Sequence, residues 1–217
     1  AAMDDRINRV IGVLNYKGGT GKTTTVVNLA SGLALRGARV LCVDLDPQGS
    51  LAAHLGVEYS DSLTDMLLGD AEPSACIYPA RKNFDILPSD RSLLKAEKEL
   101  WGMDNLRIAR RVLSDKLRNV DDSYGFVIVD FPPSVTLLSQ NGLLYITELL
   151  IPMMMSHLSV LGTQQVAGTL KAISRIPDHQ VKLLGILPTI YNGRLRKDRD
   201  ILKTIQQRFG DKVVEPI

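Results

Sequence analysis

The chain has 217 residues, of which 45% are hydrophobic and 5% aromatic, and this size predicts one globular domain spanning residues 1–217. Its 26 basic and 24 acidic residues nearly balance, so the net charge of the whole chain does not favour binding to nucleic acid. Any nucleic-acid binding must therefore rest on a local basic patch. The two cysteines, Cys42 and Cys76, lie far apart and exclude a disulfide framework and a cysteine metal site, so a reducing cytoplasm is the expected location.

The sequence predicts no membrane span. Residues 1–9 are polar and lack the apolar core of a signal peptide. The most apolar stretch, 143–161, is interrupted by Glu148, Pro152 and His157, which is typical of a helix followed by a strand.

Short apolar runs recur along the chain, and segments with helical periodicity lie between most of them. The runs cover residues 10–14, 40–45, 84–87, 126–129, 149–153, 183–187 and 213–214. Runs that are apolar throughout are typical of strands covered on both faces. The alternation therefore predicts a doubly wound α/β fold, with a mostly parallel sheet and helices on both faces.

Helix boundaries can be read from local signals. The first helix is expected at 22–36, with apolar residues at helical spacing. Ser62 begins a capping box for a short helix that Gly69 ends. An Asp-Asn pair at 104–105 can cap a helix over about 106–117.

A glycine-rich run joins the first strand to the first helix. Its glycines let backbone N–H groups approach phosphate oxygens, and the helix N-terminus adds partial positive charge. Lys22 can reach the terminal phosphates, and the Thr23 hydroxyl can bind Mg²⁺. The general phosphate-loop pattern places glycine at position 16, where this chain has Tyr16. We expect the whole run to bind nucleotide: Lys17, Gly18, Gly19, Thr20, Gly21, Lys22, Thr23 and Thr24.

Three aspartates directly follow strands, where open α/β sheets bind their ligands. Asp44 and Asp46 follow the second run, in the string Asp-Leu-Asp-Pro-Gln-Gly. Asp130 follows four apolar residues, as an acid that holds Mg²⁺ does in phosphate-loop proteins. Considered alone, each could also be an ordinary loop aspartate.

These motifs resemble those of the ParA/MinD family of deviant Walker A ATPases. The run at 17–24 resembles the deviant Walker A box, 44–49 resembles switch I of ParA-type ATPases, and 130–134 resembles switch II, with Phe131 where the family usually has a smaller residue. The resemblance runs from about residue 10 to the end of the chain.

The resemblance implies an ATP- and Mg²⁺-dependent ATPase that dimerises around two nucleotides. Lys17 would then cross to the nucleotide of the partner subunit. Asp44, with Thr23 and Asp130, would manage the Mg²⁺ shell, and Asp46 would position the attacking water. The implied catalytic residues are Lys17, Lys22 and Asp46.

Within the family, the sequence favours the ParA branch. Cluster-binding cysteines and a CxxC pair are missing, and MinD-type proteins usually lack the Asp-Pro-Gln-Gly switch. The ParA resemblance implies non-specific DNA binding on the nucleoid and a ParB-like partner that stimulates hydrolysis. A MinD-like membrane-cycling ATPase and a nucleotide-gated binding module with negligible turnover remain the alternatives.

A local basic patch is found near the end of the sequence, where residues 194–212 carry an excess of four positive charges. A helix over 195–209 would bury Leu202, Ile205 and Phe209. Its opposite side would be a solvated face or, by the ParA resemblance, a DNA-binding surface. The expected DNA-contacting residues are Arg194, Arg196, Arg199 and Lys203. Residues 213–217 resemble the last strand of the family, so we expect the family's chain to continue beyond residue 217.

Overall fold

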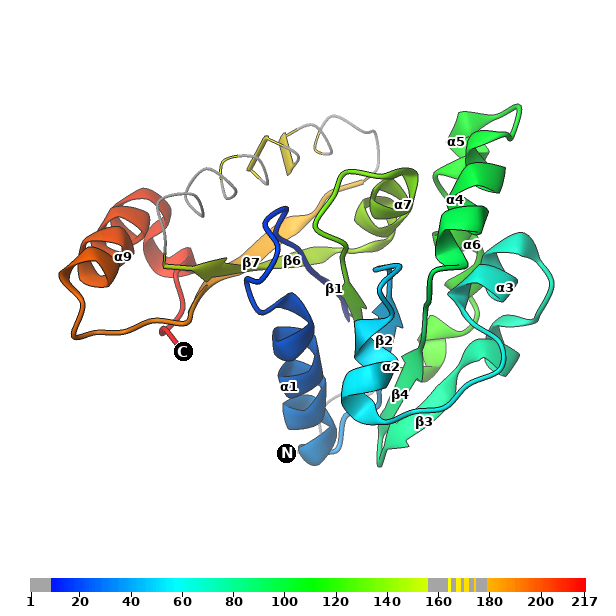
Figure 1. Ribbon diagram of the computed structural model, residues 1–217, viewed down its shortest axis with the longest axis horizontal. Helices are drawn as coiled ribbons and strands as arrows, with labels where there is room; N and C mark the ends of the chain where they lie inside the picture. Colours follow the sequence, from blue (N-terminus) through cyan, green and yellow to red (C-terminus); the bar gives the residue numbers. More distant parts are fainter. Residues whose placement is uncertain (1–8, 156–163, 165–166, 169, 172–173, 175–178) are drawn as a thin grey trace.

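The computed structural model describes residues 9–155, 164, 167–168, 170–171, 174 and 179–217. Within these residues, seven strands form one sheet in the order β3-β4-β2-β5-β1-β6-β7 (Figure 1). The strands are β1 (Arg9–Val13), β2 (Val40–Asp44), β3 (Tyr78–Arg81), β4 (Phe84–Leu87), β5 (Phe126–Asp130), β6 (Glu148–Met154) and β7 (Lys182–Thr189). Only β3 pairs antiparallel among them, so the predicted mostly parallel sheet is confirmed.

Helices cover both faces of the sheet, as predicted. They are α1 (Lys22–Leu35), α2 (Ser50–Leu55), α3 (Leu63–Leu68), α4 (Leu93–Trp101), α5 (Leu106–Ala109), α6 (Val112–Leu117), α7 (Leu137–Tyr145) and α9 (Arg196–Phe209). Short 3₁₀ helices cover Pro73–Cys76, Asp121–Ser123 and Gly210–Lys212. In the described part of the chain, no helix is both long and apolar enough to cross a membrane. His157 lies outside the described residues.

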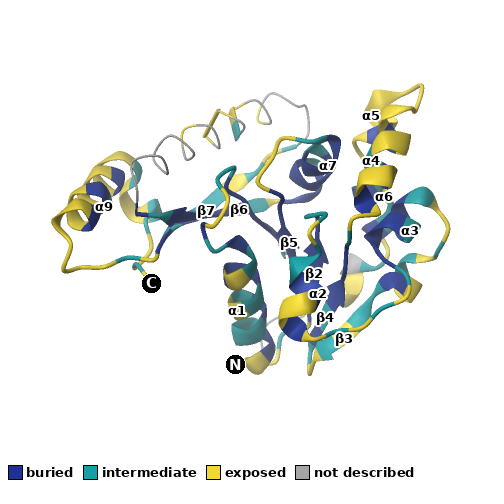
Figure 2. Cartoon of the chain, in the orientation of Figure 1, coloured by how far each residue is buried: buried dark blue, intermediate teal, exposed yellow. Residues whose placement is uncertain are grey.

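Two hydrophobic layers flank the sheet because successive side chains of each strand point to opposite faces. Val40 and Cys42 of β2 pack in the layer with α1 and α2. Leu41 and Val43 of the same strand pack in the layer with α3, α4, α6, α7 and α9. The central strands β2 and β5 are therefore apolar at every position before their final aspartates, and Figure 2 shows the central strands buried between exposed helix surfaces.

Local sequence signals place several helix ends where they were expected. The backbone N–H of Ser62 donates to the Asp65 carboxylate at 2.7 Å, and the Ser62 hydroxyl accepts from the Thr64 N–H at 3.2 Å. Gly69 ends α3 with φ 83°, a left-handed conformation that glycine adopts without steric cost. The predicted capping box and helix end are confirmed.

The predicted helix over 106–117 is wrong, because it is divided into α5 and α6. Asn105 caps α5 as expected, since its side chain accepts from the N–H groups of Arg107 and Ile108. The division is stabilised by Asn141 of α7. Its amide donates to the Ala109 carbonyl at 2.9 Å, and its oxygen accepts from the Leu113 N–H at 3.2 Å. Asn141 thus satisfies backbone groups on both sides of the break.

Two edge features also differ from the prediction. Strand β3 was not predicted, because it contains Pro79, a residue that sheets tolerate mainly at an edge. The predicted strand at 213–214 is only an isolated parallel bridge between Val213 and Ile186. The backbone still follows β7, because the N–H groups of Val214 and Ile217 donate to the carbonyls of Ile186 and Pro188, each at 3.0 Å.

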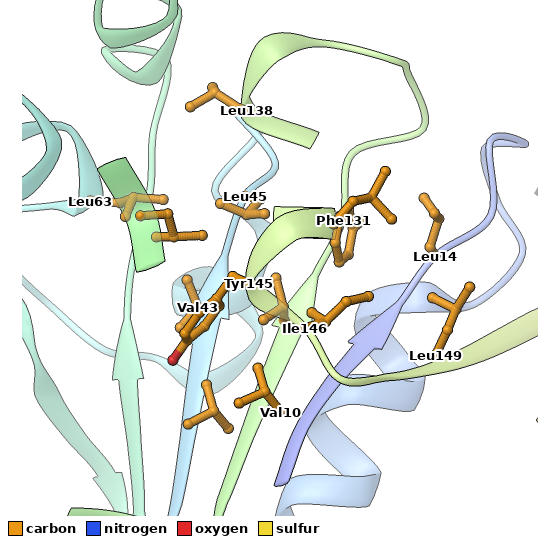
Figure 3. Close-up of a cluster of buried hydrophobic side chains, with 14 of the residues drawn as sticks. Val10, Leu14, Val43, Leu45, Leu63, Phe131, Leu138, Tyr145, Ile146 and Leu149 are labelled. Atoms are coloured by element: carbon orange, nitrogen blue, oxygen red, sulfur yellow. The ribbon is translucent and has the colours of Figure 1, made fainter. Parts of the chain in front are cut away.

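Phe131 is a core residue behind the nucleotide-facing edge. Its side chain is fully buried and lies in the cluster of Figure 3, together with Leu14 and Ile146. Two glycines make room for its ring: a Cβ on Gly12 would lie 2.8 Å from it, and a Cβ on Gly142 would lie 2.7 Å from it. The bulk at position 131 is thus matched by missing side chains on β1 and α7.

Candidate nucleotide-binding site

The loop between β1 and α1 has the backbone geometry of a phosphate cradle. Gly19 and Gly21 have φ values of 72° and 81°, which side chains rarely permit. Gly21 is also the N-cap of α1, so the helix begins at the end of the loop. Gly18, Gly19 and Thr24 are exposed, which leaves the loop backbone open to a ligand.

Hydrogen bonds from neighbouring strands hold this loop in place. The Asn15 amide donates to the Pro152 carbonyl of β6 at 2.8 Å, and its oxygen accepts from the Lys17 N–H at 3.0 Å. On the other side, the Thr189 hydroxyl of β7 donates to the carbonyl of the buried Thr20 at 2.9 Å. The cradle is therefore supported from two strands.

Lys22 lies inside the loop. Its side chain is buried, and its ammonium group donates to the Lys17 carbonyl at 3.2 Å. Burial lowers the pKa of Lys22, while the nearby carboxylates of Asp130 and Asp46 oppose that shift. The lysine is thus directed toward the carboxylates and the inner side of the loop.

Thr23 and Asp130 form the contact that best indicates a cation site. The Thr23 hydroxyl donates to Oδ2 of Asp130 at 2.6 Å. Oδ1 of Asp130 is buried and has no hydrogen-bond partner. Burial raises the pKa of Asp130 to about 6, against the lowering effects of Thr23 and Lys22. A buried oxygen of this kind lacks the compensation that a cation or its water shell would supply.

The donor set fits Mg²⁺. The described residues contain no group of three or more His, Cys, Asp or Glu side chains that could hold a metal. Mg²⁺ usually keeps several waters and takes one or two protein oxygens together with substrate phosphates. Thr23 and Asp130 beside a phosphate cradle match that pattern.

Asp44 lies next to Asp130 in the sheet, in register across β2 and β5. It is fully buried, and its two oxygens accept from the N–H groups of Asp46 at 2.9 Å and Leu51 at 3.1 Å. Burial and the charge of Asp130 raise its pKa well above the usual range. The structure thus shows Asp44 anchoring the turn between β2 and α2.

Asp46 is half-buried, and its turn is fixed at several points. Its carboxylate accepts from the Gln48 N–H at 3.0 Å. Its carbonyl accepts from the Ser89 hydroxyl at 2.6 Å. Gly49 has φ 62°, and a Cβ there would lie 2.4 Å from the Ser89 carbonyl oxygen. Glycine is therefore required for the turn to lie against Ser89.

The structure brings Lys17, Lys22, Thr23 and the three aspartates to the carboxyl edge of the sheet, as predicted from their positions after strands. Sequence reasoning missed three supporting residues: Asn15, Ser89 and Thr189. Each ends or closely follows a strand, so the rule that identified the aspartates could also have identified them.

The basic residues of α9 lie away from this site, next to the edge strand β7 (Figure 1). All four predicted residues, Arg194, Arg196, Arg199 and Lys203, are exposed. Arg199 donates to the Gly193 carbonyl at 2.7 Å, and Arg196 lies 3.7 Å from Asp200. Arg194 lies just before α9, and the other three lie within the helix with their side chains exposed.

The buried face of α9 is wider than predicted. Ile205 is buried as expected, but Leu202 and Phe209 are only half-buried. Ile201 and Asp198 are the missed inward residues. The Asp198 carboxylate accepts from the Asn192 N–H at 2.9 Å. This bond links the first turn of α9 to the loop that precedes it.

Comparison with known proteins identifies the family. A family model described as an AAA domain (AAA_31) matches residues 8–183. The chromosome-partitioning ATPase Soj of Thermus thermophilus is 36% identical over 94% of this chain and 78% of its own length. The chromosome partitioning protein ParA of Myxococcus xanthus is 32% identical over 97% of this chain and 75% of its own length.

A solved structure agrees with these relatives in fold. The cobyrinic acid a,c-diamide synthase from Mycobacterium smegmatis, with bound ATP analog and magnesium, superposes with a TM-score of 0.86. It is 36% identical, with 94% of this chain and 84% of that chain covered. The resemblance drawn from the three motifs is confirmed, and the chain belongs to the family of ParA and Soj chromosome-partitioning ATPases.

Proposed function

We propose that this protein binds ATP with Mg²⁺ and hydrolyses it. The observation that carries the proposal is the Thr23–Asp130 contact with its unpartnered buried oxygen, placed at the end of a phosphate cradle. A similar protein of known structure, the Mycobacterium smegmatis synthase, is described with a bound ATP analog and magnesium.

The chain's own residues have separate roles in this proposal. The N–H groups of residues 17–24 and the Lys22 ammonium bind phosphate oxygens. Thr23 and Asp130 would hold Mg²⁺, which supplies positive charge at the phosphates when bound. Asp44 would act on the metal's water shell through its charge and through its hold on the Asp46 turn, because both its oxygens accept backbone N–H bonds.

Asp46 is proposed to position the attacking water. Its half-buried carboxylate is placed by a turn that Asp44 and Ser89 both hold. A fixed acceptor orients the water, and positioning of this kind supplies much of the rate of phosphoryl transfer.

Lys17 is proposed to contact the nucleotide of a second subunit, which makes ATP the link between two copies of the chain. The ATP-bound dimer would attach to DNA without sequence preference through Arg194, Arg196, Arg199 and Lys203. A ParB-like partner would stimulate hydrolysis and release the dimer, so the protein would work in the cytoplasm on the nucleoid. The names of the Soj and ParA relatives support a partitioning role.

The decisive experiment is Asp46→Ala, with Asp70→Ala as a matched control at an exposed position. We expect Asp46→Ala to bind ATP and to form dimers, as measured by light scattering, but to release no phosphate. Asp70→Ala should behave like the parent protein. If Asp46→Ala releases phosphate at the parent rate, the role of Asp46 is wrong.

A further inference from the structure

Helix α4 presents a solvent-facing surface that the nucleotide site does not use. Leu93, Ala96 and Leu100 face the core, and the opposite side carries two large exposed apolar side chains. Leu94 is 56% exposed and Trp101 is 50% exposed. Figure 2 shows exposed surface along α4 and α5. Such apolar exposure next to a functional site indicates a binding surface.

Three cations lie on the same side of α4. Arg91, Lys95 and Lys98 are exposed and lie at helical spacing with Leu94 and Trp101. Among the described residues, none of the three forms a salt bridge. We call these five residues, Arg91, Leu94, Lys95, Lys98 and Trp101, the α4 face.

The acids of α4 leave this charge largely uncompensated. Glu97 is half-buried, and its carboxylate accepts from the Leu137 N–H at 2.7 Å, at the start of α7. Glu99 is the exposed acid of the helix. The α4 face is therefore both basic and apolar.

The α4 face continues into a groove beside the candidate hydrolytic residue. A cavity of about 460 Å³ is lined by Asp46, Pro47, Gln48, Arg91, Leu94, Pro132, Pro133 and Ser134. Arg91 and Leu94 belong to both the α4 face and the groove. The walls of the groove are the two segments that follow Asp44 and Asp130.

Short contacts connect α4 to both of these segments. Ser89, just before α4, donates to the Asp46 carbonyl at 2.6 Å. Glu97 binds the first N–H of α7, the helix that follows Ser134. A ligand that moved α4 would therefore act directly on the turn that holds Asp46 and on the start of α7.

We propose that the α4 face and the groove bind an acidic, amphipathic segment of a partner protein. Acidic side chains match Arg91, Lys95 and Lys98, and apolar side chains match Leu94, Trp101 and the two prolines. The proposal rests on the proposed ATPase function in one respect: a partner bound here would contact the turn that holds Asp46, the residue proposed to position the attacking water.

The shape and chemistry of the surface favour a peptide over other anionic ligands. A lipid surface is flat and would leave the groove beside Asp46 without contact. DNA phosphates would pair with the cations but would leave Leu94 and Trp101 without an apolar partner, and they would meet the Asp46 carboxylate. A peptide can satisfy both the face and the groove.

The test uses the full chain and a synthetic fluorescein-labelled peptide with glutamate and leucine at helical spacing. The control peptide has lysine in place of each glutamate. Binding is measured by fluorescence polarisation, with and without ATP and Mg²⁺. The test variant is Arg91→Glu/Lys98→Glu on the α4 face. The control variant is Arg196→Glu/Lys203→Glu on α9, which changes the net charge of the protein by the same amount. All four positions are exposed, so the fold should tolerate these changes.

We expect the parent protein to bind the glutamate peptide and not the lysine peptide. The Kd should rise about tenfold in the α4 variant, because two attractive contacts become repulsive, and should be unchanged in the α9 variant. Leu94→Ser should weaken binding without any change of charge, and the basal ATPase rate of Leu94→Ser and of the α4 double variant should stay near the parent rate.

The proposal is overturned by equal binding of both peptides, by no binding to the parent protein, or by equal weakening in the two double variants. It is also overturned if the α4 variant loses only retention on DNA or on phosphatidylglycerol vesicles, which would assign the face to those ligands. Peptide binding is scored without turnover, so a failure of the proposed hydrolysis would not be mistaken for a failure of this surface.

Discussion

The Thr23 hydroxyl donates a 2.6 Å hydrogen bond to one carboxylate oxygen of Asp130, while the other oxygen of Asp130 is buried without a partner. The bond joins the first turn of α1 to the end of β5, so the phosphate cradle and the carboxylate are in direct contact. Burying the unpartnered oxygen lowers the stability of the folded state, and a bound cation would remove this penalty.

This cost predicts a pH dependence in buffer without Mg²⁺. Burial raises the pKa of Asp130 from 3.8 to about 6, so between these values the folded state holds a proton that the unfolded chain has lost. The contribution of Asp130 to stability therefore falls as pH rises from about 4 to about 6 and is constant above. Asp130→Asn removes this titration and should raise the free energy of unfolding at pH 7 by about 3 kcal/mol. Urea denaturation of both proteins across this range would show the difference, and a pH-independent difference would contradict it.

Thr23 should control the response to Mg²⁺ rather than nucleotide binding as such. In Thr23→Ala the metal site loses one oxygen, so Mg²⁺ should no longer increase the stabilisation that ATP provides in a thermal denaturation assay. Thr23→Ser keeps the hydroxyl and should keep the response. Thr24→Ala, at an exposed neighbouring position, is the matched control. A full Mg²⁺ response in Thr23→Ala would argue against the assigned site.

Lys17 and Lys22 should be separable by experiment. Lys22 is buried inside the loop, so Lys22→Ala should abolish binding of a fluorescent ATP analogue. Lys17→Ala should leave that binding nearly unchanged while it prevents ATP-dependent dimerisation and hydrolysis, as measured by light scattering and phosphate release. Dimers of Lys17→Ala with parental affinity would show that Lys17 does not act across subunits.

The exposed arginines of α9 should contribute to DNA binding through phosphates. Arg196→Glu/Arg199→Glu should weaken retention on DNA for any sequence and reduce the slope of log affinity against log salt by about two, since each contact contributes about 0.9. Lys82→Glu, exposed in the turn between β3 and β4, is the control, and ATP binding should not change. If the variant is retained on DNA as well as the parent at moderate salt, these residues do not belong to the DNA-binding surface. If the parent protein binds vesicles and not DNA in the presence of ATP, the MinD-like alternative is favoured.

Phe131 should be coupled energetically to Gly142. Gly142→Ala places a methyl group 2.7 Å from the ring and should cost about 1–3 kcal/mol in the free energy of unfolding. Phe131→Leu relieves part of this contact, so the double variant should cost less than the sum of the single variants. Gly32→Ala, in a part of α1 where no atom from outside the local helix backbone lies within 4 Å of the added group, should instead be neutral or stabilising. Additive costs at positions 131 and 142 would contradict the coupling.

The grouping of the candidate site residues at one edge of the sheet could be predicted, because each lies in a glycine-rich run or directly after an apolar strand. Their supporting contacts could not be predicted, because they join residues far apart in the chain. The bond between Thr189 and Thr20 spans 169 positions, and no local pattern in either segment indicates it. The bond from Ser89 to Asp46 requires knowing that β4 lies beside β2.

The same reason explains why the fold was predicted better than its interruptions. Strands and helices follow from apolar spacing and capping residues, which are local. The division between α5 and α6 depends on Asn141 in α7, which offers the backbone an alternative partner at that point. The room for Phe131 depends on two glycines in other elements, whose significance appears only when the elements pack together.

The bonds from Asn15 to Pro152 and from Thr189 to Thr20 fix the phosphate loop against β6 and β7 through the chain's own side chains. A loop that is already ordered loses little conformational entropy when a nucleotide arrives. The nucleotide should therefore bind to a preorganised loop. Its association rate should be set by diffusion and charge, and not by rearrangement of the loop.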